Sequence, residues 1–389
     1  MASKISFGNP NHPWATKLVE KFDFGLSAAQ EERAVDLHKR LTIFDSLIEV
    51  TWYDNFIENV QKGALNSGAT GSLTLGAAGL KNWRGKGEEV VADPQYWWKP
   101  ESMVEDIGLL QQMEREDDKF MICYNAADLR KAKAEKKVGI MINTQNTLLF
   151  GNYLERIDQM YRIGLRITQL SYNNQNLVGS GCAEKREAGV SVFGADVIAR
   201  MNEVGMLVDT GHCMSTTVSD AIDISSKPIA CSHAGIRSHT PDVNRTIEDD
   251  VLKKLADSGG VFGMVGQPGP ISGTDYCDVG QYVDAIDKAV NIMGVDHVGF
   301  GLDHYQRTSL KTILTAPEWN PDLAARALGS AEADTDSFVD PSSDGFAGME
   351  NNSGYLNLTR GFVKKGYSDE EIVKVMGGNF IRLIEEVIG

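Results

Sequence analysis

The sequence predicts an α/β fold of the (β/α)8 TIM-barrel type, and two features of the chain lead to this expectation. Eight short segments of strand length with alternating apolar residues recur along it, at 42–47, 71–75, 138–142, 166–170, 206–209, 228–232, 260–265 and 297–301. Amphipathic segments with helical spacing lie between several of them, at 153–162, 195–204, 215–225, 247–257 and 281–293. Eight parallel strands that alternate with outer helices are what this barrel requires. Expected helix ends also carry glycine: Gly164, Gly205, Gly259 and Gly294.

Two long segments interrupt the alternation. Residues 76–137 form an insertion after the second strand, with a Trp-rich stretch WRGKGEEVVADPQYWWKP and a short strand FMICY. Residues 305–352 have weak periodicity and predict a long loop after the eighth strand. Residues 1–40 precede the barrel, and two helices follow it, one beginning with a capping box at Ser368 and Glu371. Without an internal repeat or a low-complexity linker, we expect one domain over 1–389.

Composition excludes several classes of partner. With 42% hydrophobic and 24% charged residues the chain is globular, and its net charge of −16 argues against nucleic acid and anionic membranes as partners. Its N-terminus has no continuous apolar segment of signal-peptide length, and the sequence has no uncharged run of about 18 residues, so a cytoplasmic location is the expectation. A homo-oligomer is left open. The five cysteines are scattered and odd in number, which predicts neither a disulfide framework nor a zinc ribbon.

Histidines follow two consecutive expected strands. His212 comes directly after GMLVD, and His233 ends the run PIACSH. Asp303 occupies the same position after HVGFGL. Because strand ends converge on one face of a barrel, these three side chains are candidates for one metal site. For any one of the histidines alone, a hydrogen-bonded structural role is the alternative.

Four segments resemble successive motifs of one family: DTGHCMSTTVSDAI, SSKPIACSHAGIRSHTPDVNRTIEDDVLKKLADSGGVFGM, DHVGFGLD and NLTRGFVKKGYSDEEIVKVMGGNFIRLIEEV. The chain resembles the membrane (renal) dipeptidases of the amidohydrolase superfamily over roughly 40–388. The resemblance implies a metal-dependent hydrolase. In that family two zinc ions are held by a His-x-Asp pair on the first strand, a bridging Glu on the third, two His on the fifth and sixth, and an Asp on the eighth.

The resemblance carries over His212, His233 and Asp303, but this chain diverges elsewhere. Leu47 and Glu49 in DSLIE stand at the positions of the His-x-Asp pair, and Gln145 in NTQNT stands where the bridging Glu is expected. A two-metal site needs a bridging carboxylate, and Leu cannot ligate. We therefore expect at most one tightly bound divalent ion, Zn²⁺, at His212, His233 and Asp303, with Glu49 or Gln145 completing the set.

Three residues are assigned to the chemistry. Asp303 is expected to accept the proton of the attacking water. Tyr172, in LSY, replaces a family His that polarises the scissile carbonyl, and its phenol can donate to the same oxygen. Arg245, in VNRT, matches the family Arg that binds the substrate carboxylate, with a surface ion pair as the alternative.

The expected function is hydrolysis of a dipeptide, or of a related small amide or N-acyl amino acid, by metal-activated water. The alternative is a metal-poor lyase or isomerase, or a ligand-binding relative without catalysis, which Leu47 and Gln145 favour. The substrate itself is not identified, because the segments expected to select it, 76–137 and 305–352, are the least family-like.

Overall fold

The computed structural model describes residues 18–49, 56–64, 69–74, 98–116, 118–274, 276–303 and 346–389. Its centre is a parallel sheet whose neighbouring strands follow the order β1-β2-β4-β5-β6-β7-β9-β11. The bounds are β1 Ile43–Glu49, β2 Ala69–Thr74, β4 Val138–Thr144, β5 Ile167–Gln169, β6 Leu207–Asp209, β7 Ala230–Ile236, β9 Val261–Val265 and β11 Val298–Gly301. Each strand falls on one of the eight expected apolar runs.

The first and last strands of this order lie against each other. The backbone N–H of Asp303 donates to the carbonyl of Leu47 at 3.2 Å, and that of Leu302 donates to Asp45 Oδ1 at 2.9 Å. The sheet therefore curls back on itself, and the predicted α/β barrel class is confirmed.

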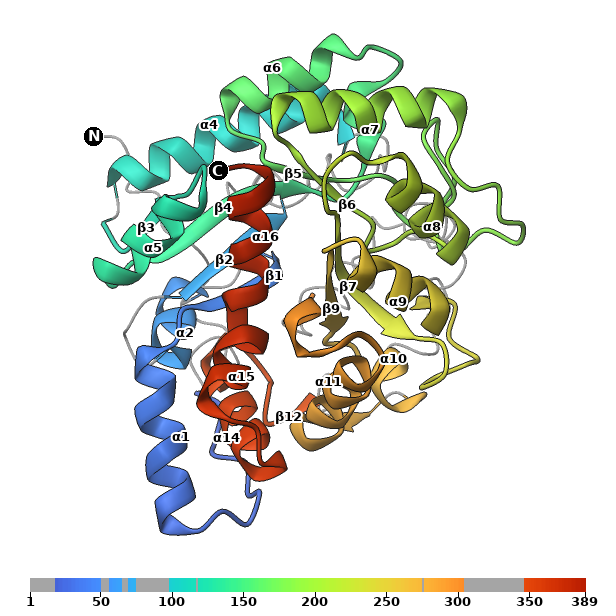
Figure 1. Cartoon of the computed structure of the whole chain (residues 1–389). Coiled ribbons are helices and arrows are strands. Elements are labelled where there is room, and N and C mark those ends of the chain that lie inside the picture. The colour runs from blue at the N-terminus through green and yellow to red at the C-terminus, as the bar shows by residue number, and fades with distance from the viewer. Residues whose placement is uncertain are drawn as a thin grey trace, which may run out of the picture.

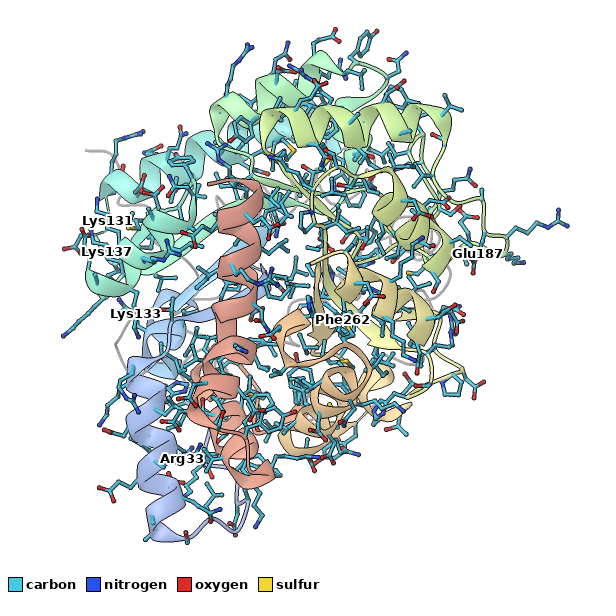
Figure 2. All side chains as sticks on the ribbon, in the orientation of Figure 1. Arg33, Lys131, Lys133, Lys137, Glu187 and Phe262 are labelled. Atoms are coloured by element: carbon cyan, nitrogen blue, oxygen red, sulfur yellow. The ribbon has the colours of Figure 1, made fainter. Side chains whose placement is uncertain are left out.

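Helices surround the sheet, as Figure 1 shows. They are α1 Ala28–Arg40, α2 Phe56–Gly63, α4 Pro100–Glu116, α5 Ala126–Ala134, α6 Glu155–Ile163, α7 Val192–Val204, α8 Ser215–Ile224, α9 Asp249–Asp257, α10 Pro268–Ser272, α11 Val279–Met293, α14 Tyr355–Lys365, α15 Asp369–Val373 and α16 Asn379–Val387. Short helical turns are η2 Thr147–Phe150, η3 Val295–His297, η5 Asn352–Gly354 and η6 Lys374–Gly378. Figure 2 shows Phe262 of β9 inside this ring, while Lys131, Lys137 and Glu187 point outward at its edge.

Several helix ends and one helix start lie where the sequence predicted them. Helices α6, α7 and α11 end at Gly164, Gly205 and Gly294, all with positive φ, and the capping box at Ser368 and Glu371 is present. The expected strand FMICY is β3, Phe120–Ile122, which pairs with β4. One boundary was wrong: α9 begins two residues after the expected position 247, because Thr246–Ile247 form a short strand, β8, on β7.

The C-terminal helix closes the amino end of the barrel. Phe380 of α16 stacks on Phe44 near the start of β1, with ring centroids 5.8 Å apart. The same cluster contains the first residues of four further strands: Ile167, Leu207, Ala230 and Val261. In Figure 1 α16 accordingly crosses the middle of the ring. The amino end is thus packed with apolar side chains, and the carboxyl ends of the strands are left for a site.

A layer of small residues fills the barrel interior beneath those carboxyl ends. The Ser46 hydroxyl donates to the carbonyls of Ser232 (2.5 Å) and Phe300 (2.8 Å). A Cβ added at Gly263 would lie 1.9 Å from the Ser232 carbonyl oxygen, and one at Gly301 would lie 2.4 Å from it. These glycines, on β9 and β11, let both strands lie close to the β7 backbone, so this layer of the interior is filled by backbone and small side chains. We call Ser46, Ser232, Gly263 and Gly301 the floor.

Several expectations fall outside the described residues, including the Trp-rich part of the insertion with Trp83 and Trp97, most of the loop 305–352, and residues 1–17. Within the loop, the described part holds a two-residue strand, β12 Phe346–Ala347, which pairs with β10 Cys277–Asp278. The single-domain assignment stays a prediction. In the part of the chain that the structure describes, no helix combines the length and apolar character needed to cross a membrane.

Candidate metal centre

Three predicted ligands meet at the carboxyl ends of three strands. His212 follows β6, His233 lies in β7 and Asp303 follows β11. One ligand atom from each lies within 4.8 Å of the others, and His233 Nε2 is 3.9 Å from Asp303 Oδ2. Their exposed fractions are only 1%, 0% and 2%. This convergence requires the curled parallel sheet, since the three residues are far apart in the sequence.

A hydrogen-bonded chain orients His233. The hydroxyl of Ser232 donates to Asp209 Oδ2 at 2.6 Å, and it lies 2.7 Å from His233 Nδ1. Because the hydroxyl proton is used toward Asp209, Ser232 accepts from His233, and the imidazole carries its proton on Nδ1. The pairing of β7 with β9 shifts register between Cys231 and Ala234, and such a bulge re-aims the side chains that it contains.

His212 is oriented by a separate partner. Its Nδ1 lies 2.6 Å from Asn173 Oδ1, an acceptor, so this imidazole also carries its proton on Nδ1. The Cys182 thiol donates to the same amide oxygen at 3.3 Å. Tyr172 stacks on the His212 ring with centroids 4.0 Å apart, and Trp98 lies against Tyr172 at 5.2 Å. Tyr172, three residues after β5, and Trp98, in the insertion, thus border one side of the site with aromatic rings.

The remaining atoms of these side chains fit a divalent cation. Nε2 of His212, Nε2 of His233 and Oδ1 of Asp303 are buried without a hydrogen-bond partner among the described residues. Burial and the nearby Arg245 hold the pKa of both histidines well below the ordinary value, so both rings are neutral and keep a lone pair on Nε2. Neutral imidazoles and a carboxylate are the ligands of catalytic zinc sites. A buried polar atom without a partner is costly, and an ion would satisfy all three.

Asp303 is held in an unusual backbone conformation. Its φ is +47°, a left-handed value that costs energy for a non-glycine residue, least for Asp and Asn. Its Oδ2 accepts from Gln267 Nε2 at 2.8 Å and lies 3.5 Å from Arg245 Nη2. Burial raises the pKa of Asp303, and Arg245 acts against that rise. The protein therefore holds Oδ2 of this carboxylate, and Oδ1 is the oxygen that can contact a cation.

Arg245 lies inside the site and not on the surface. Its exposed fraction is 7%, and besides approaching Asp303 it donates from Nη2 to the backbone carbonyl of His233 at 3.4 Å. The alternative of a surface ion pair is therefore wrong. A buried guanidinium next to a metal centre is suited to binding a carboxylate.

The other expected ligands are placed less completely. Gln145 is buried directly after β4, and its backbone carbonyl accepts from Gln169 Nε2 at 2.8 Å. Glu49 ends β1 opposite Thr74, and its side chain lies outside the described part of the chain. Leu47 is fully buried, so the position that holds a His in the family supplies an apolar side chain here.

Sequence reasoning missed the residues that orient the ligands: Asn173, Asp209, Ser232 and Gln267. Two of them stood in the quoted motifs, and their signal was a polar residue at the end of an apolar run. Asp209 closes MLVD and Ser232 closes PIACS. Burial raises the pKa of Asp209, while hydrogen bonds from Ser232, Thr210 and Gly211 lower it. A buried carboxylate that accepts this many hydrogen bonds is typical of a residue that orients a neighbouring metal ligand.

The chain is similar to known dipeptidases and amidohydrolases in sequence and in fold. The dipeptidase tcpJ of Claviceps purpurea is 26% identical over 325 residues, which cover 81% of this chain and 68% of that protein. An amidohydrolase from Pseudomonas aeruginosa superimposes with a TM-score of 0.73 at 26% identity, covering 92% of this chain and 99% of that one. A metallo peptidase from Rhodobacter sphaeroides, solved with a phosphinate mimic of the dipeptide L-Ala-D-Ala, shares the fold with a TM-score of 0.67 at 16% identity, over 89% of this chain and 99% of that chain.

The family model of the membrane dipeptidases matches residues 31–340, most of the chain. That span contains the eight strands of the central sheet and the three converging candidate ligands. The chain therefore belongs to the membrane dipeptidase family, peptidase family M19, and is a metallodipeptidase-like hydrolase.

Proposed function

We propose that the protein hydrolyses a dipeptide, or a related small amide or N-acyl amino acid, with one divalent cation held by His212, His233 and Asp303. The observation that carries the proposal is the buried cluster of three ligand atoms within 4.8 Å of one another. Zn²⁺ suits two neutral imidazoles and a carboxylate. Glu49 or Gln145 would complete the set, and a second tightly held ion is not expected because Leu47 and Gln145 replace two of the family's ligands.

A zinc ion supplies Lewis acidity, which makes water a nucleophile near neutral pH. The protein's part is to position groups around the scissile bond. The Asp303 carboxylate, whose Oδ2 accepts from Gln267, is positioned to accept the proton of the attacking water.

Two further residues bind the substrate in this proposal. Arg245 binds a free carboxylate of the substrate, since its guanidinium is buried beside Asp303. Tyr172 donates to the carbonyl oxygen as negative charge develops there, and its stacking on His212 places the ring beside the ligands. A dipeptide carries both the carboxylate and the scissile amide. The dipeptide mimic bound by the Rhodobacter sphaeroides relative supports this substrate class.

The second candidate is a metal-poor lyase or isomerase, or a relative that binds a ligand without hydrolysis. The buried, apolar Leu47 at a family ligand position favours it. Elemental analysis of protein purified without added metal or chelator separates the candidates: one equivalent of zinc supports the hydrolase, and none with or without supplement supports the second candidate. Two equivalents would contradict the single-ion site. A cytoplasmic location stays a prediction from the sequence.

Activity is tested on dipeptides and N-acyl amino acids. Asp303→Asn keeps a residue that tolerates the left-handed backbone, so the fold should remain. Its amide oxygen can still contact the cation, so most of the bound metal should remain as well. Turnover should fall by ~10² or more, as for loss of a positioned general base. His212→Ala should lose both metal and activity. The hydrolase assignment fails if wild type turns over none of these substrates at any metal supplement, and the role of Asp303 fails if Asp303→Asn stays fully active.

A further inference from the structure

A buried carboxylate lies next to the candidate metal centre and reaches the ligand His233 only through Ser232. Asp209, the last residue of β6, is 2% exposed. Its Oδ1 accepts three backbone N–H groups, from Thr210 at 2.7 Å, Gly211 at 3.2 Å and Ser232 at 2.8 Å. Its Oδ2 accepts the Ser232 hydroxyl. Oδ1 is thus committed to backbone donors, and Oδ2 is committed to one side chain that itself contacts His233.

We propose that Asp209 is a positioning residue that acts through Ser232 to fix the tautomer of His233, and thereby makes its Nε2 a ligand. The three residues form the Asp209 relay. The direction of its hydrogen bonds follows from the first acceptor: a carboxylate can only accept, so Ser232 must donate to it and must accept from His233 Nδ1–H. Nε2 then has a lone pair and faces Asp303 at 3.9 Å. The inference rests on the proposed function, since a ligand role for His233 is part of it.

The isosteric substitution Asp209→Asn tests the direction of the hydrogen bond between Ser232 and His233. In Asp209→Asn the three backbone N–H groups require the amide oxygen at the Oδ1 position, which leaves the amide NH₂ facing Ser232. The hydroxyl would then accept from the amide and donate to His233 Nδ1. His233 would carry its proton on Nε2, and that tautomer cannot bind a metal through Nε2.

The first measurement uses metal-free protein. Histidine side chains labelled with ¹⁵N report the tautomer through the chemical shifts of the two ring nitrogens, and comparison with His233→Gln assigns the signal among the seven histidines of the chain. Wild type should show His233 protonated on Nδ1, and Asp209→Asn should show it protonated on Nε2. Ser232→Ala, which removes the link but not the backbone bonds of Asp209, should show a mixture.

The second measurement is zinc affinity, by competition with a chromophoric chelator. Asp209→Asn should bind zinc about 10- to 100-fold more weakly than wild type, the usual effect of losing a partner of a ligating histidine. Ser232→Ala should fall between the two. The matched control is Asp220→Asn, because Asp220 of α8 accepts a backbone N–H from Val190 at 2.9 Å and lies outside the relay. It should change neither the tautomer nor the affinity.

The two proposals fail in different ways. An unchanged Nδ1–H tautomer in Asp209→Asn, with wild-type zinc affinity, overturns the relay and leaves the metal site intact. Wild-type protein that binds no zinc overturns the proposed function, while the tautomer experiment still reports on the relay. If Asp209→Asn does not fold, Ser232→Ala decides: an unchanged tautomer and affinity there overturn the relay, and a mixed tautomer with weaker zinc binding supports it.

Discussion

The strongest steric test of the metal centre is at Gly211, the residue before His212. A Cβ built there would lie 2.6 Å from His233 Nδ1, 2.7 Å from His233 Cε1 and 2.8 Å from Gln169 Oε1. Ordinary van der Waals contact begins at 3.4 Å, so Gly211→Ala requires the imidazole to move by about 0.8 Å, more than the ~0.5 Å tolerance of a functional constellation. A His233 ring displaced by that distance would lose either its hydrogen bond to Ser232 or its contact with the ion.

Two quantities should change in Gly211→Ala. Overpacking should lower the free energy of unfolding of the metal-free protein by about 1 to 3 kcal/mol. Displacement of His233 should weaken zinc binding by about 10- to 100-fold, which is the usual range when the support of a ligand is lost. Urea unfolding in the presence of a chelator measures the first, and chelator competition measures the second. Zinc should also protect the variant from thermal unfolding less than it protects wild type.

Gly269 supplies the matched control, because a Cβ added there meets nothing within 4 Å. Gly269→Ala should bind zinc as wild type does. If Gly211→Ala also binds zinc with wild-type affinity, the arrangement of His233 described above is not the one that holds the ion.

Two further predictions concern a substrate contact and a distant buried histidine. Arg245→Lys should raise KM about tenfold for substrates with a free carboxylate and leave amide-capped substrates unaffected, because a point charge replaces a planar fork; equal effects on both substrates would argue against carboxylate binding. His38 is buried between Thr359 and Gly63, and burial lowers its pKa to about 4. As pH falls, the unfolded chain therefore binds this proton before the folded chain does. The free energy of unfolding that comes from keeping His38 neutral is complete above about pH 6.5 and is lost toward pH 4. Urea unfolding should show about 2 kcal/mol less stability at pH 5 than at pH 7 from this group, and His38→Gln should lack that loss; identical pH dependence in both proteins would refute the assignment.

The sequence predicted the strands and helices that have a regular pattern of apolar residues. It missed the features that depend on pairing with a neighbouring strand. The eight strands were found because apolar residues alternate within each short segment, and His212, His233 and Asp303 were found because each follows such a segment. The start of α9 was misplaced because Thr246 and Ile247 pair with β7, and pairing across a sheet leaves no periodicity within the segment itself.

The support for the ligands could not be predicted for the same reason. Ser232 can link Asp209 to His233 only because neighbouring strands bring them together where the register of β7 shifts. The left-handed conformation of Asp303 likewise depends on the approach of β1, whose Leu47 carbonyl receives its N–H. The family resemblance supplied ligand positions and could not supply these local contacts.

The floor beneath the metal centre limits how this enzyme can change. Because the Ser232 carbonyl would lie 1.9 Å from a Cβ at Gly263 and 2.4 Å from one at Gly301, and because Ser46 donates to that same carbonyl, none of these positions accepts a larger side chain without moving β7. Substitutions that alter substrate range are therefore expected among side chains at the carboxyl ends of the strands, such as Tyr172 and Arg245, and not in the floor. Directed evolution of new specificity should recover its productive variants at those strand ends and none at the floor.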